Sequence, residues 1–279
     1  ETLESYYRGE LAHPLLGCQL KDEPRKNGKM TRMFSMSPVD NTIVHRMFLM
    51  PFYSLMPEMG EAFCTSIGIN MHSYDVDNFA KGMISFGDKF MEGDYGGYDT
   101  SMPPDITALS NTVVHDVLKH FGYNEKQLKI VRGILSDNLH PTLVLDGVVF
   151  NVAGFQPSGK YATAEDNSLK GIILLMYAWC SMMTKEGKKH PLNKTIKYTP
   201  DDFWDYVYPK CYGDDMLASI KDDILEHFNN QTYQEFCETI YGMKFTASDK
   251  SMNISKYLTW DQTSFLKRSF RYREDLGHW

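Results

Sequence analysis

Two adjacent carboxylates interrupt a pair of apolar runs late in the chain, and this pattern restricts the local structure more than any other stretch. Residues 206–208 are aromatic and β-branched, and residues 216–220 are mostly apolar, as in two short strands. Between them stand Gly213, Asp214 and Asp215. The pattern predicts a strand, a tight turn holding Gly213 and Asp214, and a second strand, with acidic side chains projecting from the tip.

Such a pair of aspartates permits two interpretations. An Asp-Asp sequence in a polar turn is most often a solvated turn. Carboxylates that lose water need a cation nearby, and hard oxygen ligands suit Mg²⁺. The sequence of Asp214-Asp215 alone does not decide between a solvated turn and a metal site.

The composition describes a folded chain that is not basic overall. At 279 residues with 42% hydrophobic residues, the chain is long enough for one large domain or two that share a core. The net charge of −7 argues against binding nucleic acid by overall charge, although a local basic groove remains compatible with it. The five cysteines lack zinc-ligand spacing, so we expect reduced thiols.

We expect neither a signal peptide nor a membrane span in this chain. Its first residues have neither a basic nor an apolar signal region, and residues 171–183, the longest apolar stretch, are shorter than the roughly 20 residues of a membrane span. The chain begins without Met, so we expect a fragment of a longer protein.

The remaining apolar patterns predict alternating helices and strands. We expect helices over 39–60 (bounded near Pro51 and Pro57), 76–86, 105–121 and 222–241, a strand at 15–20, and a short strand followed by a turn over 244–250. Residues 141–150 hold Asp146-Gly147 between β-branched runs, which predicts a hairpin. Residues 184–200 are polar and basic, which predicts a surface insertion.

Two further stretches carry polar groups at the ends of predicted elements. Asp94 ends a short predicted strand, and Asp99 follows after a Gly-Gly pair; both are either turn formers or ligands. Ser158 precedes a long apolar helix that reaches about residue 183. Thr163 and Asn167 lie four residues apart on one face of that helix, where they either cap and fill the core or bond a hydroxyl-bearing ligand.

Two basic stretches complete the pattern. Residues 21–32 contain Lys21, Lys29 and Arg32 around an Asn-Gly turn, either a solvated loop or a grip on triphosphate oxygens. Residues 265–271 alternate aromatic and basic side chains, including Lys267 and Arg268. This alternation favours a hairpin that packs on one face and meets phosphate with the other.

Taken in order, these segments resemble the motifs of viral RNA-dependent RNA polymerases, most closely those of picorna-like viruses. Residues 21–32 resemble motif F, 94–99 motif A, 157–167 motif B, 212–215 motif C, 241–251 motif D and 265–268 motif E. The resemblance implies an α+β fold: a right-hand palm, whose antiparallel sheet is backed by helices, with part of the fingers. It implies fingers at 1–50, palm at 51–130, a fingers insertion at 131–156 and palm at 157–279, and we expect a fragment that lacks the family's N-terminal extension and thumb.

The resemblance also assigns roles to individual residues. Asp94 and Asp214 become the principal ligands of two Mg²⁺ ions (or Mn²⁺), with Asp215 assisting, and Lys250 the general acid for pyrophosphate. Asp99 and Asn167 read the 2′-hydroxyl of the incoming nucleotide. The remaining candidates are Lys21, Lys29 and Arg32 for the triphosphate, Ser158, Gly159 and Thr163 beside the sugar, and Lys267 and Arg268 for the primer backbone.

The implied reaction is two-metal joining of ribonucleoside triphosphates to an RNA 3′-hydroxyl with release of pyrophosphate. The implied partners are template and primer RNA, the nucleotides, other viral replication proteins and, in one of two open priming modes, a protein primer. The implied location is the host cytoplasm, at membrane-associated replication complexes.

Two alternatives remain. A reverse transcriptase shares the Tyr-x-Asp-Asp turn, but it carries a bulky residue that excludes the 2′-hydroxyl, where this chain has Asp99. A catalytically silent palm that only binds RNA is the other alternative, and the presence of every expected acidic residue speaks against it.

Overall fold

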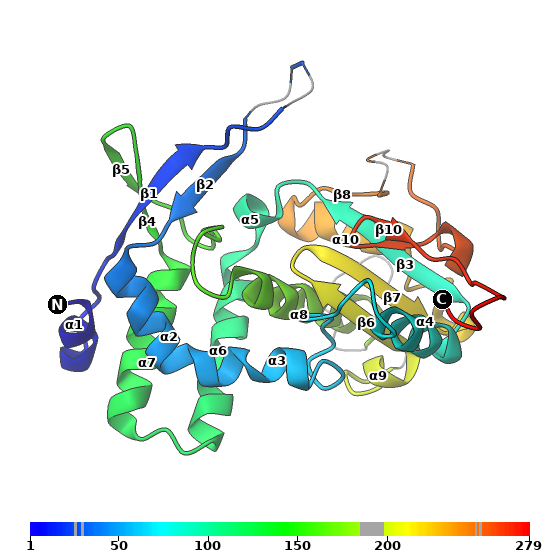
Figure 1. The fold of residues 1–279 in the computed structure, drawn as a ribbon, viewed down its shortest axis with the longest axis horizontal. Helices are drawn as coiled ribbons and strands as arrows, with labels where there is room; N and C mark the ends of the chain where they lie inside the picture. The colour runs from blue at the N-terminus through cyan, green and yellow to red at the C-terminus, as the bar shows by residue number, and fades with distance from the viewer. Residues whose placement is uncertain (25–26, 29–30, 185–197, 249, 251–252) are drawn as a thin grey trace. The chain divides into compact units, whose positions relative to one another are not determined.

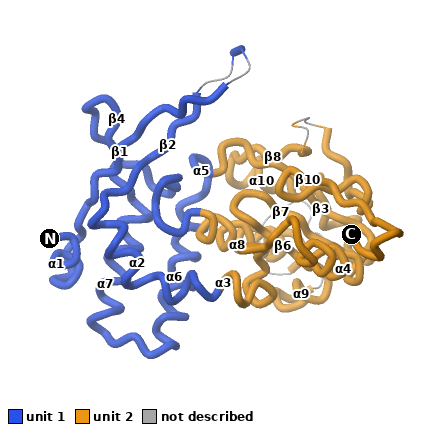
Figure 2. The backbone as a smooth tube through the Cα atoms, viewed as in Figure 1, with its two compact units in different colours: residues 1–55, 99–163 blue, residues 56–98, 164–279 orange. Residues whose placement is uncertain are grey.

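The computed structural model describes residues 1–24, 27–28, 31–184, 198–248, 250 and 253–279. The chain divides into two compact units (Figure 2): unit 1 comprises residues 1–55 and 99–163, and unit 2 comprises residues 56–98 and 164–279. Each unit is therefore built from two separate pieces of the sequence. The predicted surface insertion falls largely on residues 185–197, outside the described residues.

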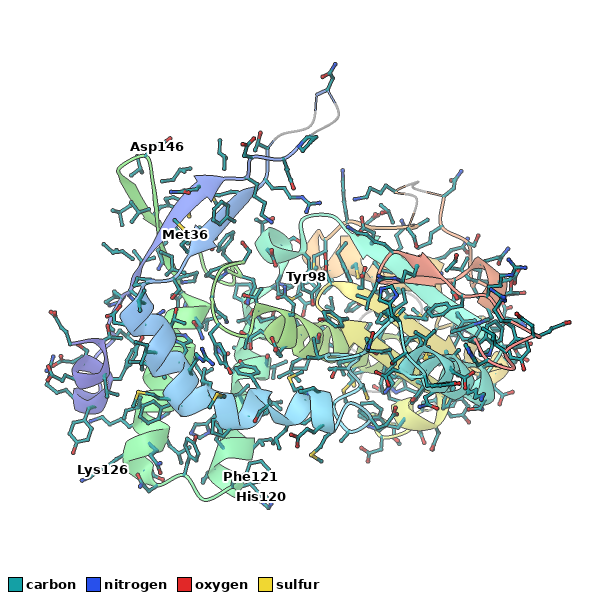
Figure 3. All side chains as sticks on the ribbon, viewed as in Figure 1. Met36, Tyr98, His120, Phe121, Lys126 and Asp146 are labelled. Atoms are coloured by element: carbon teal, nitrogen blue, oxygen red, sulfur yellow. The ribbon has the colours of Figure 1, made fainter. Side chains whose placement is uncertain are left out.

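Unit 1 contains a four-stranded sheet in the order β2-β1-β4-β5. Its strands are β1 (Leu15–Leu20), β2 (Met33–Met36), β4 (Thr142–Leu145) and β5 (Val148–Asn151). The β4–β5 hairpin is the one predicted from the Asp-Gly pair: Asp146 and Gly147 both have positive φ, as a tight two-residue turn requires, and Asp146 lies at its tip (Figure 3). Leu16, Leu143 and Phe155 form its apolar core.

The helices of unit 1 are α1 (Thr2–Arg8), α2 (Val39–Tyr53), α6 (Pro104–His120) and α7 (Glu125–Leu139). The short helices α3 (Leu55–Glu58) and α5 (Tyr98–Ser101) each have residues in both units. The strand at 15–20 and the helices near 39–60 and 105–121 are confirmed, although α2 continues through Pro51. The apolar patterns of the sequence did not predict α7. Its signal was a capping box, in which Asn124 accepts from the amide of Gln127 and the Gln127 side chain accepts from the amide of Asn124.

Unit 2 is built on a four-stranded antiparallel sheet in the order β6-β7-β3-β8 (Figure 1). The strands are β3 (Lys89–Tyr95), β6 (Val207–Tyr212), β7 (Asp215–Ile220) and β8 (Phe245–Thr246). The predicted acidic hairpin is confirmed as β6 and β7. The antiparallel sheet with its separate helices confirms the α+β class.

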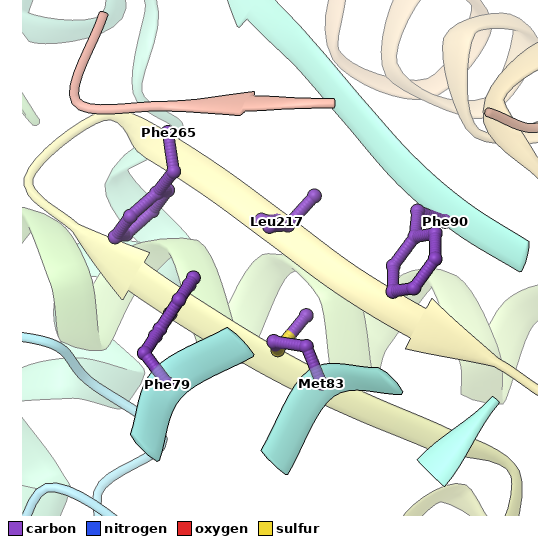
Figure 4. Close-up of a cluster of buried hydrophobic side chains, with 5 residues drawn as sticks. All are labelled: Phe79, Met83, Phe90, Leu217 and Phe265. Atoms are coloured by element: carbon purple, nitrogen blue, oxygen red, sulfur yellow. The ribbon is translucent and has the colours of Figure 1, made fainter. Parts of the chain in front are cut away.

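One face of this sheet packs against α4 (Asp75–Phe86) and the short hairpin of β9 (Ser264–Phe265) and β10 (Arg268–Ser269). Figure 4 shows the cluster: Phe79 and Met83 from α4 meet Phe90 of β3, Leu217 of β7 and Phe265 of β9. The rings of Phe79 and Phe265 stack at 5.0 Å between centroids. Burying these five side chains attaches the hairpin to the sheet.

The helix α8 (Thr163–Met183) comes close to strand β6 at a glycine. A Cβ on Gly171 would stand 3.4 Å from the Sγ atom of Cys211 and 3.3 Å from the hydroxyl of Tyr98. The residues of α8 are buried along most of its length, as its continuous apolar sequence predicts.

The prediction of one helix over 222–241 is wrong in its first half. A short 3₁₀ helix covers Asp222–Ile224, and α10 begins only at Asn230 and ends at Tyr241. Asn229 is extended and its side chain accepts from the amides of Gln231 and Thr232, so this residue caps a new helix instead of continuing an old one. The other short helices are α9 (Phe203–Tyr206) and a 3₁₀ turn at Trp260–Gln262.

The five cysteines are free thiols, four of them buried. In the described part of the chain, no helix has both the length and the apolar character that crossing a membrane demands.

Candidate active site

The acidic turn joins β6 to β7 at the end of the sheet in unit 2. Tyr212 and Asp215 form the last pair of the hairpin, and Gly213 in the turn has a φ of +64°, a conformation that glycine adopts without strain. The amide of Gly213 donates to Ser168 Oγ on α8 at 2.8 Å. This hydrogen bond ties the turn to α8, and Asp214 is exposed at the tip of the turn.

Asp94 lies at the same end of the sheet, on the neighbouring strand. The register of β3 against β7 ends with Gly93 opposite Met216, and Asp94 and Asp215 are the next residue on each strand. Directly opposed residues of an antiparallel pair have Cβ atoms about 5 Å apart. The structure therefore brings together the three carboxylates that the sequence separates by 120 positions.

The charge of this cluster is concentrated. Burial, followed by the nearby carboxylates of Asp214 and Asp94, raises the pKa of Asp215 to about 6, and the Lys267 ammonium works in the opposite direction. A carboxyl group whose ionised form is disfavoured in this way gains from a bound cation. The donors are all oxygens, which is the chemistry that Mg²⁺ prefers.

A cation of the chain already contacts this cluster. The Lys250 Nζ atom lies 3.0 Å from Asp94 Oδ2 in an ion pair that is partly open to solvent. Within the described residues, no three His, Cys, Asp or Glu side chains form a ready set of metal ligands. In this arrangement Asp94 turns toward Lys250, so the structure shows the carboxylates as neighbours and not as a closed metal cage.

Glu92 is a fourth carboxylate on the same strand as Asp94, and it was not predicted as a site residue. Glu92 is 6% exposed and stands two residues before Asp94, so both side chains leave the same face of β3. Its Oε2 atom accepts from the amide of Ser264 at 2.6 Å, and its Oε1 atom accepts from the hydroxyls of Ser264 and Ser248. The sequence did contain a signal for Glu92: it is an ionisable residue in an apolar strand, two positions from Asp94, so it lies on the same face of that strand.

Beside Asp215 a cavity of about 480 Å³ opens between Tyr212, the turn of the β9–β10 hairpin and residues 69–72. Lys267 and Arg268 line it. Their contact with phosphate stays a prediction. The Arg268 Nη2 atom lies 3.3 Å from His72 Nε2. His72 belongs to none of the motifs, and nothing in its sequence context marked it.

The predicted sugar-contacting residues fall in both units. Asn167 lies on α8 in unit 2, 6% exposed, and its backbone carbonyl accepts from the Tyr98 hydroxyl at 2.7 Å. Asp99 belongs to unit 1, where its carbonyl accepts from the amide of Gln156 at 2.8 Å. The prediction that Asp99 and Asn167 contact one hydroxyl therefore stays a prediction.

The loop before α8 has a tight backbone in unit 1. A Cβ on Gly159 would lie 1.9 Å from the carbonyl oxygen of Ser35, so only glycine allows this loop to approach β2. The Thr163 hydroxyl donates to the carbonyls of Lys160 and Pro157 at 2.9 and 3.1 Å, which closes the loop. Ser158, next to Gly159, is half-buried.

The basic loop predicted to bind triphosphate also belongs to unit 1. The amide of Lys21 donates to the carbonyl of Arg32 at 2.8 Å, so these two cations stand at the base of one loop. The Arg32 Nε atom lies 3.8 Å from a Glu23 carboxylate oxygen. Lys29 lies outside the described residues.

Comparison with known proteins identifies relatives of the whole chain. The chain is 28% identical over 256 residues to the genome polyprotein of Deformed wing virus, an alignment that covers 91% of this chain and 8% of the polyprotein. It is 29% identical over 269 residues to the replicase polyprotein of Acute bee paralysis virus, covering 93% of this chain and 14% of that one. The chain thus spans a small part of these relatives.

A solved polymerase structure has the same fold as this chain. The Sicinivirus 3Dpol RNA dependent RNA polymerase superposes with a TM-score of 0.78 at 18% identity, covering 98% of this chain and 54% of that polymerase. This likeness confirms the predicted polymerase fold. The family model described as "Viral RNA-dependent RNA polymerase" matches residues 3–278. The chain therefore belongs to the viral RNA-dependent RNA polymerases, and its relatives are those of the picorna-like viruses.

Proposed function

We propose that the polymerase containing this chain synthesises RNA on an RNA template. It joins ribonucleoside triphosphates to the 3′-hydroxyl of a growing strand and releases pyrophosphate, for replication and transcription of a viral genome. The observation that carries the proposal is the meeting of Asp94 with Asp214 and Asp215 at one end of the sheet in unit 2. Family membership supports the same reaction.

Asp94 and Asp214 would hold the divalent ions, with Asp215 as an auxiliary ligand. Three observations support this assignment: the donors are oxygens, the carboxylates are neighbours on adjacent strands, and the pKa of Asp215 is raised by its burial and then by the nearby carboxylates of Asp214 and Asp94. When bound, a pair of Mg²⁺ ions (or Mn²⁺) stabilises the entering and leaving oxygens of the displacement.

Lys250 would supply a proton to the departing pyrophosphate. A general acid must lie within reach of the leaving group, and the ion pair with Asp94 holds the Lys250 ammonium at the carboxylate cluster. Its side chain is 61% exposed, so it retains room to reach a substrate.

Other residues would bind the substrates. Asp99 and Asn167 would bond the ribose 2′-hydroxyl, the group that separates RNA from DNA precursors. Charge-assisted bonds would hold phosphates at the triphosphate and at the primer backbone. The residues proposed for these contacts are Ser158, Gly159 and Thr163 beside the sugar, Lys21, Lys29 and Arg32 at the triphosphate, and Lys267 and Arg268 at the primer.

We propose the same division as the motifs imply: fingers at 1–50 and 131–156, and palm at 51–130 and 157–279. The partners would be template and primer RNA, nucleotides, other viral replication proteins and, where priming is protein-linked, a protein primer. The site of action would be the host cytoplasm, at membrane-associated replication complexes. Relatives that are replicase polyproteins support this setting.

Extension of an RNA primer on an RNA template by the full-length polymerase tests the proposal. With Mg²⁺ we expect template-directed incorporation of ribonucleotides and little incorporation of deoxynucleotides. A preference for deoxynucleotides would identify a reverse transcriptase instead. RNA binding without any metal-dependent incorporation would identify a catalytically silent palm.

A further inference from the structure

Glu92 connects three parts of unit 2 that are far apart in the sequence. It lies on β3 with Asp94, and one carboxylate accepts hydrogen bonds from Ser248 and Ser264, 156 and 172 residues away. We propose that Glu92 is a positioning residue that fixes the Lys250 segment and the Lys267–Arg268 turn relative to Asp94. This inference rests on the proposed function of those residues.

The first connection holds the β9–β10 hairpin. Ser264 starts β9, and both its amide and its hydroxyl donate to Glu92 at 2.6 Å. Each strand of the hairpin has only two residues, and Leu266 and Lys267 in its turn both have positive φ. Such a hairpin is not stable by itself, and non-glycine residues keep positive φ only where their surroundings impose it.

Two contacts impose this conformation. Phe265 is 2% exposed in the cluster with Phe79, and Ser264 next to it is bound to Glu92. Phe265 supplies burial energy, whereas the Glu92 contact specifies direction, because an amide and a hydroxyl must both point at one carboxylate. Glu92 therefore orients the turn that presents Lys267 and Arg268 beside Asp215.

The second connection holds the segment of Lys250. Strand β8 has only two residues, which pair with Asp94 and Tyr95, and Ser248 follows two residues later with its hydroxyl donating to Glu92. Lys250 stands two residues beyond Ser248 with a φ of +68°, and its amide donates to the carbonyl of Ala247 at 2.7 Å. The Glu92 contact thus fixes this segment just before the residue whose ammonium lies 3.0 Å from Asp94.

The charge of the carboxylate strengthens both connections. Oε1 faces the hydroxyls of Ser248 and Ser264, and Oε2 accepts from the amide of Ser264. A glutamine can keep its oxygen on the Ser264 amide and donate its NH₂ group to the serine hydroxyls, which can also accept, but all of these bonds are neutral. Glu92→Gln therefore keeps the volume of the side chain and weakens both connections, because hydrogen bonds to a carboxylate are roughly twice as strong as neutral ones.

The two connections predict separable defects. In the full-length polymerase, Ser264→Ala should weaken primer–template binding by roughly 10-fold, because a hydrogen bond to a charged group is lost at the hairpin. Ser248→Ala should lower kcat by roughly 10-fold and leave the Kd for primer–template RNA unchanged. Glu92→Gln should show both defects.

The experiment measures the Kd for primer–template RNA by fluorescence anisotropy, and kcat and KM for one templated nucleotide. Matched controls are Ser85→Ala, whose exposed hydroxyl bonds its own helix at Gly82, and Glu226→Gln, an exposed partner of Lys256. Melting temperatures are measured for every variant. Both controls should keep the wild-type Kd and kcat.

The inference is overturned if Glu92→Gln and both serine variants lower the melting temperature but keep the Kd and kcat of the controls, since Glu92 would then only stabilise the fold. If Glu92→Gln does not fold, the two serine variants decide by the same criteria. If the wild-type polymerase incorporates no nucleotide, the proposed function fails, and the RNA affinity of Ser264→Ala still tests the hairpin connection.

Discussion

At the scale of single residues, burial and then the negative charge of the site raise the pKa of Asp215. Its backbone belongs to the last pair of the hairpin, and its side chain is half-buried between Asp214 and Asp94. Its usual pKa is 3.8, and its pKa in the folded chain is raised to about 6, so the folded chain holds this proton more tightly than the unfolded chain does. Asp215 therefore opposes folding once it is ionised, unless a cation is bound.

This sign gives a prediction for the metal-free polymerase. Between pH 4 and about 6 the unfolded state has already released the Asp215 proton and the folded state has not, so stability should fall as pH rises. Melting temperatures measured in EDTA across this range should fall more steeply for the wild type than for Asp215→Asn. Identical slopes for the two proteins would contradict the raised pKa.

Asn167 provides the residue-scale test of sugar selection. If its side chain reads the 2′-hydroxyl, Asn167→Ala should raise the ratio of deoxynucleotide to ribonucleotide incorporation by about 10-fold or more, the cost of one lost hydrogen bond in a polar site. The measurement is kcat/KM for matched ribo- and deoxynucleotides. An unchanged ratio would show that Asn167 is only a buried packing residue on α8.

At the scale of elements, hairpins and strands with local signals were predictable from sequence. The Asp146-Gly147 hairpin and the acidic β6–β7 hairpin each carry their turn residues between apolar runs, so short-range chemistry determines them. The helix predicted over 222–229 is wrong because a local hydrogen-bonding signal was overlooked. Its apolar residues are spaced as in a helix, but Asn229 caps a new helix, and this local hydrogen bonding overrides the periodicity.

The contact between β3 and β8 gives a prediction at this scale. A Cβ on Gly93 would lie 2.3 Å from the ring of Phe245, and the ring cannot yield without disturbing its buried neighbours. Gly93→Ala should destabilise the fold by about 1–3 kcal/mol, seen as a lower melting temperature. Gly82→Ala is the control: its Cβ would find the Tyr208 hydroxyl at 3.4 Å, and alanine favours the helix α4. An equal melting temperature for Gly93→Ala and wild type would contradict this packing.

At the scale of the whole molecule, the sequence predicted which acidic residues form the site but not which residues position them. The order of the motifs predicted the meeting of Asp94 with Asp214 and Asp215, because each lies at the end of an apolar strand. The Glu92 contacts with Ser248 and Ser264 could not be predicted, since nothing local indicates which distant serine a buried glutamate will meet.

The central claim is that Asp94 and Asp214 hold the metal ions for nucleotide addition. Incorporation of one templated ribonucleotide by the full-length polymerase, measured as a function of Mg²⁺ concentration, tests it most directly. Changes in residues that merely support a metal ligand already cost 10–100-fold, so Asp214→Asn and Asp94→Asn should each lose more than about 100-fold. Asp205→Asn, an exposed aspartate on α9, should match the wild type. Near-wild-type incorporation by Asp214→Asn at every Mg²⁺ concentration would contradict the account.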